Sequence, residues 1–188
     1  MHSNTKKLAQ AALILAICLM AQYFKNVSVY ISGPIINACL IIAALSVSLG
    51  YGMILSVITP ITAFFYTGSP IMASIPLMFP AIMAGNAILT WFVWYFHKKS
   101  SSAKSLLTGM ILGSIVKAAF MAIVIVGILL PVFGNNIASR LPKPEALPGV
   151  LATARITFSV TQLIAALLGC ALAWAIWTPL KNYLKNEH

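Results

Sequence analysis

A lysine stands in the middle of a long apolar stretch of this chain, within the sequence GSIVKAAFMA. Lys117 lies about 12 residues from either end of the run 105–130, which is otherwise uncharged. In a helix this is roughly 18 Å, too far for its side chain to extend to water. A lysine at the centre of a membrane helix costs roughly 2.5–3.5 kcal/mol. We therefore expect Lys117 to face protein, water or a ligand.

The apolar stretches contain no acid that could pair with this lysine. The only acidic residues are Glu145 and Glu187, and both lie outside these stretches. A buried cation without a protein counter-ion is best compensated by an anionic ligand, such as a carboxylate entering from outside. The alternative is a structural role, with Lys117 neutral or hydrogen-bonded to carbonyls and hydroxyls of neighbouring helices. The sequence favours the ligand.

A second polar group stands at the start of the last apolar stretch. Arg155, Ser159 and Gln162 are spaced by four and then three residues, which places them on one face of a helix. Small residues such as Gly169 continue the same face and permit close packing. We expect this helix to line a polar cavity in its outer half; the alternative is a snorkelling arginine with incidental polar neighbours.

Further candidates are an amide and two pairs of small residues. Asn86 can both donate to and accept from a small polar molecule, although an interhelical hydrogen bond would use the same groups. Gly109 and Gly113 lie on the Lys117 face and are expected to pack within the bundle. Ala12 and Ala16 form a similar small patch, which could receive another protein.

The composition indicates that these residues belong to a membrane protein. Of 188 residues, 61% are hydrophobic and 7% charged, too few charges to cover a soluble surface. We predict an all-α integral membrane protein with one domain, 1–188, built as a compact bundle of six transmembrane helices. The predicted helices are 8–24, 34–50, 52–67, 71–96, 105–130 and 155–178.

The basic residues predict how the bundle is oriented. The net charge of +10 is spread over helix ends, which argues against a nucleic-acid partner. With both termini cytoplasmic, seven lysines lie inside and four basic residues outside, in accord with the positive-inside rule. The inner set is Lys6, Lys7, Lys98, Lys99, Lys104, Lys181 and Lys185, and the outer set is Lys25, Arg140, Lys143 and Arg155.

Two proline-containing segments should shape the outer side. The segment 131–154 carries four prolines and is expected to be a long outer loop, either an ordered lid or a mobile tether. Pro76 and Pro80 should loosen or bend the outer half of the fourth helix.

The chain lacks the motifs of several other function classes. It has no HExxH, GxSxG or GxxxxGK[ST], so no catalytic residues, cofactor or nucleotide site are predicted. Cys18, Cys39 and Cys170 fall inside apolar stretches without metal-ligand spacing. An intramembrane enzyme is a minor alternative. A self-sufficient small secondary transporter or channel remains the main one, although no inverted repeat or acidic proton relay is evident.

Taken together, these features resemble a known family. Six helices in under 200 residues, the small pair Ala12 and Ala16, a long outer segment before helix six and basic inner ends are similar to the substrate-binding S-component of energy-coupling factor (ECF) transporters. The resemblance covers essentially the whole chain. It implies a prokaryotic cell-membrane receptor for a vitamin or similar micronutrient.

The resemblance also implies partners and a site. The S-component would work with a transmembrane scaffold subunit, contacted by Ala12 and Ala16, and with two cytoplasmic ATPases that supply the energy. Its ligand would sit in the outer half, where Arg155, Ser159, Gln162, Asn86 and Lys117 are the candidate contacts. Ligand binding would order the outer loops, and the whole subunit would then topple to expose the site inside. We expect a carboxylate-bearing ligand of the biotin, lipoate, pantothenate or niacin class.

Overall fold

The chain is an all-α protein with no strands among the residues that the computed structural model describes, 2–24 and 28–186. Six helices in this part of the chain are long and apolar enough to cross a membrane, which confirms an integral membrane protein. These spans are Asn4–Tyr23, Val29–Val47, Leu49–Thr67, Met78–Lys99, Ala103–Val132 and Pro144–Asn182.

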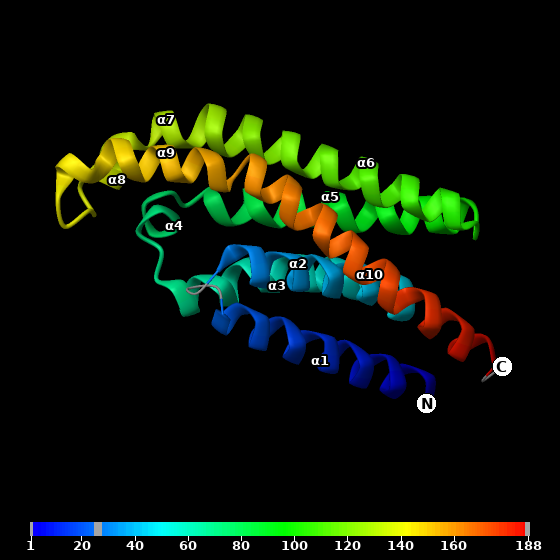
Figure 1. The fold of residues 1–188 in the computed structure, drawn as a ribbon. Coiled ribbons are helices and arrows are strands. Elements are labelled where there is room, and N and C mark those ends of the chain that lie inside the picture. The colour runs from blue at the N-terminus through cyan, green and yellow to red at the C-terminus, as the bar shows by residue number, and fades with distance from the viewer. Residues whose placement is uncertain (1, 25–27, 187–188) are drawn as a thin grey trace.

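The long helices run side by side along the molecule (Figure 1). They are α1 (His2–Tyr23), α2 (Val29–Ile42), α3 (Leu49–Thr67), α5 (Met78–Lys99), α6 (Ala103–Met121) and α10 (Val160–Asn186). The largest interfaces join α5 with α6, α10 with α2 and α3 with α5. Both termini lie at one end, which we call the terminal end, and the short helices α4 (Pro70–Ser74), α8 (Gly134–Ala138) and α9 (Leu147–Thr157) lie at the opposite, distal end.

Local sequence signals determine where several helices begin and end. The Ser28 hydroxyl accepts a hydrogen bond from the Tyr30 amide at the start of α2, and the Ser102 hydroxyl does the same for the Ser105 amide at the start of α6, each at 3.2 Å. Gly68, with φ of 54°, ends α3 in a left-handed conformation that favours glycine.

Two helices contain wide π-helical segments. One, η2 (Ala43–Val47), follows α2, and the other, η3 (Ala122–Leu129), continues α6 directly above Lys117. At the end of η3 the amide of Leu130 donates to the carbonyl of Ile125, five residues earlier. The helix therefore continues across the span. Beyond Lys117 its side chains are rotated around the helix axis relative to an unbroken α-helix.

Glycines bring the helix backbones into close contact. A Cβ on Gly113 would lie 3.0 Å from the Phe92 Cβ on α5, and one on Gly169 would lie 2.5 Å from the Asn37 Cβ on α2. Because real Cβ atoms do not approach this closely, α10 crosses α2 at a distance that only glycine permits. Asn37 is therefore held in place by the crossing helix.

The distal end differs from the loop expected there. The segment 131–154 is largely helical, because it contains parts of α7 (Leu130–Val132) and α9 as well as α8 and the short 3-10 helix η4 (Pro144–Ala146). Pro131, Pro144 and Pro148 lie in the first turns of three of these helices, where proline costs no hydrogen bond.

Two expected helices are also interrupted. The fourth one divides at Pro76 into α4 and α5, and the sixth divides at Phe158 and Ser159 into α9 and α10. The first break lies where proline was expected to loosen the helix.

We predict that Gly169→Ala destabilises the protein, because the added methyl group must push α10 away from the Pro34 carbonyl and the Asn37 side chain. Overpacking of this kind typically costs about 1–3 kcal/mol. Gly149→Ala is the matched control in α9, since no atom lies within 4 Å of its added Cβ. Thermal unfolding in detergent should show a lower midpoint for the first variant only. Equal unfolding midpoints for the two variants would mean that α10 does not pack closely against α2 at Gly169.

Candidate functional site

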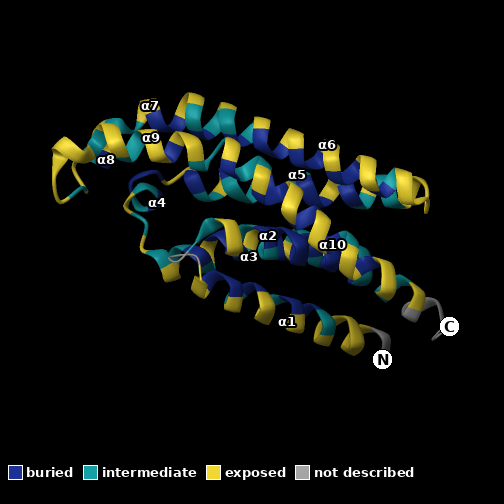
Figure 2. Cartoon of the chain, in the orientation of Figure 1, coloured by how far each residue is buried: buried dark blue, intermediate teal, exposed yellow. Residues whose placement is uncertain are grey.

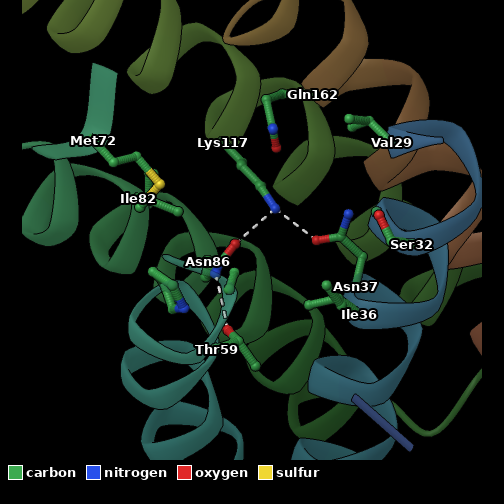
Figure 3. A pocket seen from close by; sticks show the side chains of 13 residues that line it. Val29, Ser32, Ile36, Asn37, Thr59, Met72, Ile82, Asn86, Lys117 and Gln162 are labelled. Atoms are coloured by element: carbon green, nitrogen blue, oxygen red, sulfur yellow. Dashed lines mark hydrogen bonds between the residues drawn. The ribbon is translucent and has the colours of Figure 1, made fainter. Parts of the chain in front are cut away.

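Lys117 is buried at the centre of the bundle, with 2% of its surface exposed. Its Nζ donates to Asn37 Oδ1 at 2.6 Å and to Asn86 Oδ1 at 2.9 Å (Figure 3). The three residues come from α6, α2 and α5, so one ammonium group joins three membrane helices. Both acceptors are neutral amides.

The hydrogen bonds continue from this lysine to α3 and α1. Asn86 Nδ2 donates to Thr59 Oγ1 at 3.5 Å, and Gln22 Nε2 donates to the Thr59 carbonyl at 3.0 Å. Gln22 is fully buried, so this contact places a polar group of α1 inside the bundle. Five helices therefore contribute to one buried polar network.

A cavity of about 80 Å³ opens above the network toward the distal end. Figure 3 shows the Lys117 ammonium between the amides of Asn37, Asn86 and Gln162. The polar residues that line this inner cavity are Ser32, Asn37, Thr59, Asn86, Lys117 and Gln162.

A wider and more apolar cavity of about 270 Å³ adjoins the inner one. Val29, Met72, Ile82 and Gln162 line both cavities. The outer cavity is further bounded by α4 and by the junction of α9 and α10, including Ile71 and Phe158. The two spaces therefore form a path that is polar at its inner end and mainly apolar nearer the distal end.

Several donors in the inner cavity are not used by the protein. A lysine ammonium has three N–H donors, and Lys117 uses two of them on Asn37 and Asn86. Among the described residues, neither Asn37 Nδ2 nor the Gln162 amide has a hydrogen-bond partner. The described part of the chain also places no carboxylate against Lys117, because Glu145 lies in η4 at the distal end. The cavity can therefore donate several hydrogen bonds to an anionic or carbonyl-bearing group.

The structure brings only some of the sequence-predicted residues together. Lys117, Asn86 and Gln162 line the inner cavity. Ser159 donates its hydroxyl hydrogen to the Arg155 carbonyl, and Arg155 itself is exposed. Neither residue is among those lining the two cavities. The expected single face is divided because the helix breaks at Phe158 and Ser159, between Arg155 and Gln162.

The sequence reasoning missed Asn37, which contacts Lys117 directly. The available signal was an amide in the middle of the apolar run IINACLII, where polar residues are rare and costly. Thr59 and Ser32 were missed as well, since hydroxyls can bond to their own helix backbone and give a weaker signal.

The second predicted surface lies away from the cavities. Ala12 and Ala16 are exposed on α1, together with Leu13, Ile17 and Met20. Figure 2 shows exposed residues along this outward face of the helix.

Comparison with known proteins gives one match. The family described as "ECF transporter, substrate-specific component" matches residues 6–179, which is nearly the whole chain. No curated protein and no solved structure matches the chain.

We predict that Asn86→Leu destabilises the protein through Lys117, because it removes one of the two acceptors of a buried ammonium. Leaving a charged donor without its acceptor costs about 1–3 kcal/mol or more. In a Lys117→Met background the same substitution should cost far less, since no charge remains to be satisfied. A double-mutant cycle on thermal unfolding in detergent measures this coupling. Additive effects of the two substitutions would contradict it.

Proposed function

Since the chain belongs to the family of ECF transporter substrate-specific components, we propose that it is the high-affinity receptor of an ATP-driven importer for a small carboxylate-bearing vitamin or cofactor precursor. A component of this family is a multi-pass cell-membrane protein and a transport subunit. It takes a small-molecule substrate and works with membrane scaffold and ATPase partners. To this family assignment we add a proposed chemical class for the ligand and a proposed mode of binding.

The observation that carries this proposal is the buried Lys117 at the inner end of the cavity. Its ammonium is bonded to two amide oxygens, which solvate the charge but do not neutralise it. A ligand carboxylate would supply the missing negative charge through a charge-assisted hydrogen bond. Asn37 Nδ2 and the Gln162 amide, which both line the same cavity, would donate to the remaining oxygens.

The shape of the site supports a ligand with one polar and one apolar end. The outer cavity is lined by apolar side chains, including Ile71, Met72, Ile82 and Phe158. Its volume of about 270 Å³ is close to the lower bound of about 300 Å³ for small-molecule sites. The ligand would enter with its carboxylate first, and its apolar body would remain between α4 and α9.

The remaining parts of the proposal concern the orientation of the protein in the membrane and the source of energy for import. We place both termini in the cytoplasm, in accord with the distribution of lysines, so that the distal end receives the ligand from outside. The Ala12 and Ala16 surface of α1 would dock on the scaffold subunit, since its small side chains permit close helix contact. ATP would be hydrolysed by the partner subunits. Arg155, which is exposed at the distal end, would attract the anion but not hold it.

We predict that the protein purified from rich medium retains a small anionic molecule, and that Lys117→Met loses it. Removing one charge-assisted hydrogen bond should weaken affinity by about 1–3 kcal/mol, or about 5- to 150-fold. Native mass spectrometry measures the retained adduct, and calorimetry with the identified compound gives the affinity.

Lys104→Met is the matched control for this experiment, because it removes a lysine from an exposed position near the start of the same helix. It should leave affinity unchanged, and Arg155→Met should have a smaller effect than Lys117→Met. Full affinity in the Lys117→Met protein, with normal folding, would refute the anionic-ligand proposal.

We predict that Ala12→Trp or Ala16→Trp blocks assembly with the scaffold and ATPase subunits while ligand binding is retained. A large ring on this face would prevent close helix contact. Ala119→Trp is the matched control, since Ala119 is exposed on α6, on the opposite side of the bundle from α1. Co-purification of the complex and ATP-dependent uptake into vesicles are the readouts. Assembly that survives both α1 substitutions would place the docking surface elsewhere.

A further inference from the structure

The two cavities of the ligand site differ in size, and this difference restricts what each of them can hold. The inner cavity around Lys117 has a volume of about 80 Å³, whereas the outer cavity has about 270 Å³. A closed apolar cavity of about 150 Å³ is enough to bind a benzene molecule. The outer cavity can therefore accept a ring, but the inner one has room only for a carboxylate and part of a narrow chain.

Four side chains line both cavities and form the boundary between them. They are Val29 of α2, Met72 of α4, Ile82 of α5 and Gln162 of α10, and we call this boundary the neck. Figure 3 shows Met72 and Ile82 on one side of Gln162 and Val29 on the other. A ligand that occupies both cavities must pass between these side chains.

The apolar side of the neck is held in place by packing. Met72 is only 4% exposed and belongs to a buried apolar cluster that also contains Met78 and Ile125. Ile82 packs against the same cluster. To widen the neck, these side chains would have to leave a packed core, in which a change of even one methylene group is felt. The neck therefore favours a narrow part of the ligand.

The inner cavity also disfavours a ring for chemical reasons. Asn37 Nδ2 and the Gln162 amide line it, and neither has a hydrogen-bond partner among the described residues. An apolar ring packed against these groups would leave them buried and unpaired, which costs free energy. A carboxylate would accept hydrogen bonds from them instead. The acidic group of the ligand should therefore lie deepest, with only a narrow chain behind it.

The position of the neck along α5 indicates the length of this chain. Asn86, which accepts a hydrogen bond from Lys117, lies four residues after Ile82 on the same helix. The neck is therefore one turn, or about 6 Å, closer to the distal end than the amide. An extended alkyl chain covers this distance with about four or five carbon–carbon bonds of about 1.5 Å each.

The lining of the outer cavity indicates what the other end of the ligand is. Ile71 and Phe158 are among its apolar side chains, and none of the described residues that line it is charged. The hydroxyls of Thr67 and Thr153 already donate to carbonyls of their own helices, each at 3.0 Å. A second ionised group would be placed here without a partner, which is unfavourable. This end of the ligand should therefore be uncharged.

We propose that the substrate is a monocarboxylic acid with a compact, uncharged ring at the end of an unbranched chain of about four methylene groups. The carboxylate binds Lys117, the chain lies in the neck and the ring fills the outer cavity. This inference rests on the proposed function, from which it takes the carboxylate. It adds a selection by shape, which excludes acids whose carboxylate is bonded directly to a ring, such as niacin.

The test is calorimetry of the purified protein with three simple acids: 5-phenylpentanoate, benzoate and pentanoate. Benzoate lacks the chain, and pentanoate lacks the ring. We expect 5-phenylpentanoate to bind at least about 10-fold more tightly than either of the other two, because it alone can place a carboxylate at Lys117 and a ring in the outer cavity at the same time. The neutral 5-phenylpentanamide is the fourth probe, and it should bind at least about 5-fold more weakly than the matching acid.

Ile82→Ala tests the neck itself. The smaller side chain widens the boundary, so benzoate should gain at least about 5-fold in affinity relative to 5-phenylpentanoate. Ile71→Ala shortens a side chain that lines only the outer cavity, so it should weaken 5-phenylpentanoate and give benzoate no gain.

Ile123→Ala is the matched control, because Ile123 is 64% exposed and does not line either cavity. It should change each affinity by less than about 2-fold. Thermal unfolding in detergent checks that each variant is folded. If Ile82→Ala does not fold, Ile82→Val widens the neck less, and the comparison of the acids on the unchanged protein needs no variant.

The outcomes distinguish this inference from the function on which it rests. Equal binding of 5-phenylpentanoate and its amide would refute the carboxylate, and both proposals with it. Preference for the acid over its amide, together with equal affinities for benzoate and 5-phenylpentanoate, would keep the anionic ligand and overturn the chain. Equal affinities for pentanoate and 5-phenylpentanoate would overturn the ring. No binding of 5-phenylpentanoate by a protein that retains an anion through Lys117 would overturn this inference alone, and an unchanged ratio in Ile82→Ala would overturn the neck.

Discussion

The fold depends on satisfying one lysine side chain buried inside an apolar bundle. An ammonium cannot be left without acceptors at this depth, so α2 and α5 must each present an amide oxygen to Lys117 of α6. Two of the close glycine contacts serve this arrangement. Gly169 allows α10 to press against Asn37, and Gly85 leaves room for Met121 and Lys117 on α6. These two close contacts are therefore arranged around the buried polar side chains.

The amide acceptors also bear on the proposed anionic ligand. A carboxylate partner within the protein would neutralise the lysine and leave little attraction for a ligand. Asparagine oxygens stabilise the ammonium while its net charge is kept. The Asn37 Nδ2 group then remains available as a donor, whereas Asn86 Nδ2 donates to Thr59 Oγ1. On our proposal, the same contacts that make the lysine tolerable also prepare the site for an anionic ligand.

Features that depend on local composition could be predicted from the sequence. The six spans follow from runs of apolar residues, and Lys117 was singled out because nothing else in its span is charged. Its contact with Asn37 could not be predicted, since Asn37 lies 80 positions away and only the packing of α2 on α10 and α5 brings it there. The prediction that Arg155, Ser159 and Gln162 share one helix face was wrong for a local reason. Its spacing assumes an unbroken helix, and no proline or glycine marks the interruption at Phe158 and Ser159.

The wide turns of η3 change the orientation, relative to Lys117, of the side chains that follow them in the same helix. A π-helical segment contains one residue more than an α-helix would need to make the same number of turns. That single extra residue rotates everything beyond it by about 100° around the helix axis. Ile125, Leu129 and Leu130 are all buried in this phase. The number of residues between Ala122 and Leu129 therefore determines which side chains beyond η3 face the bundle interior. The identity of these residues matters less for that orientation than their number.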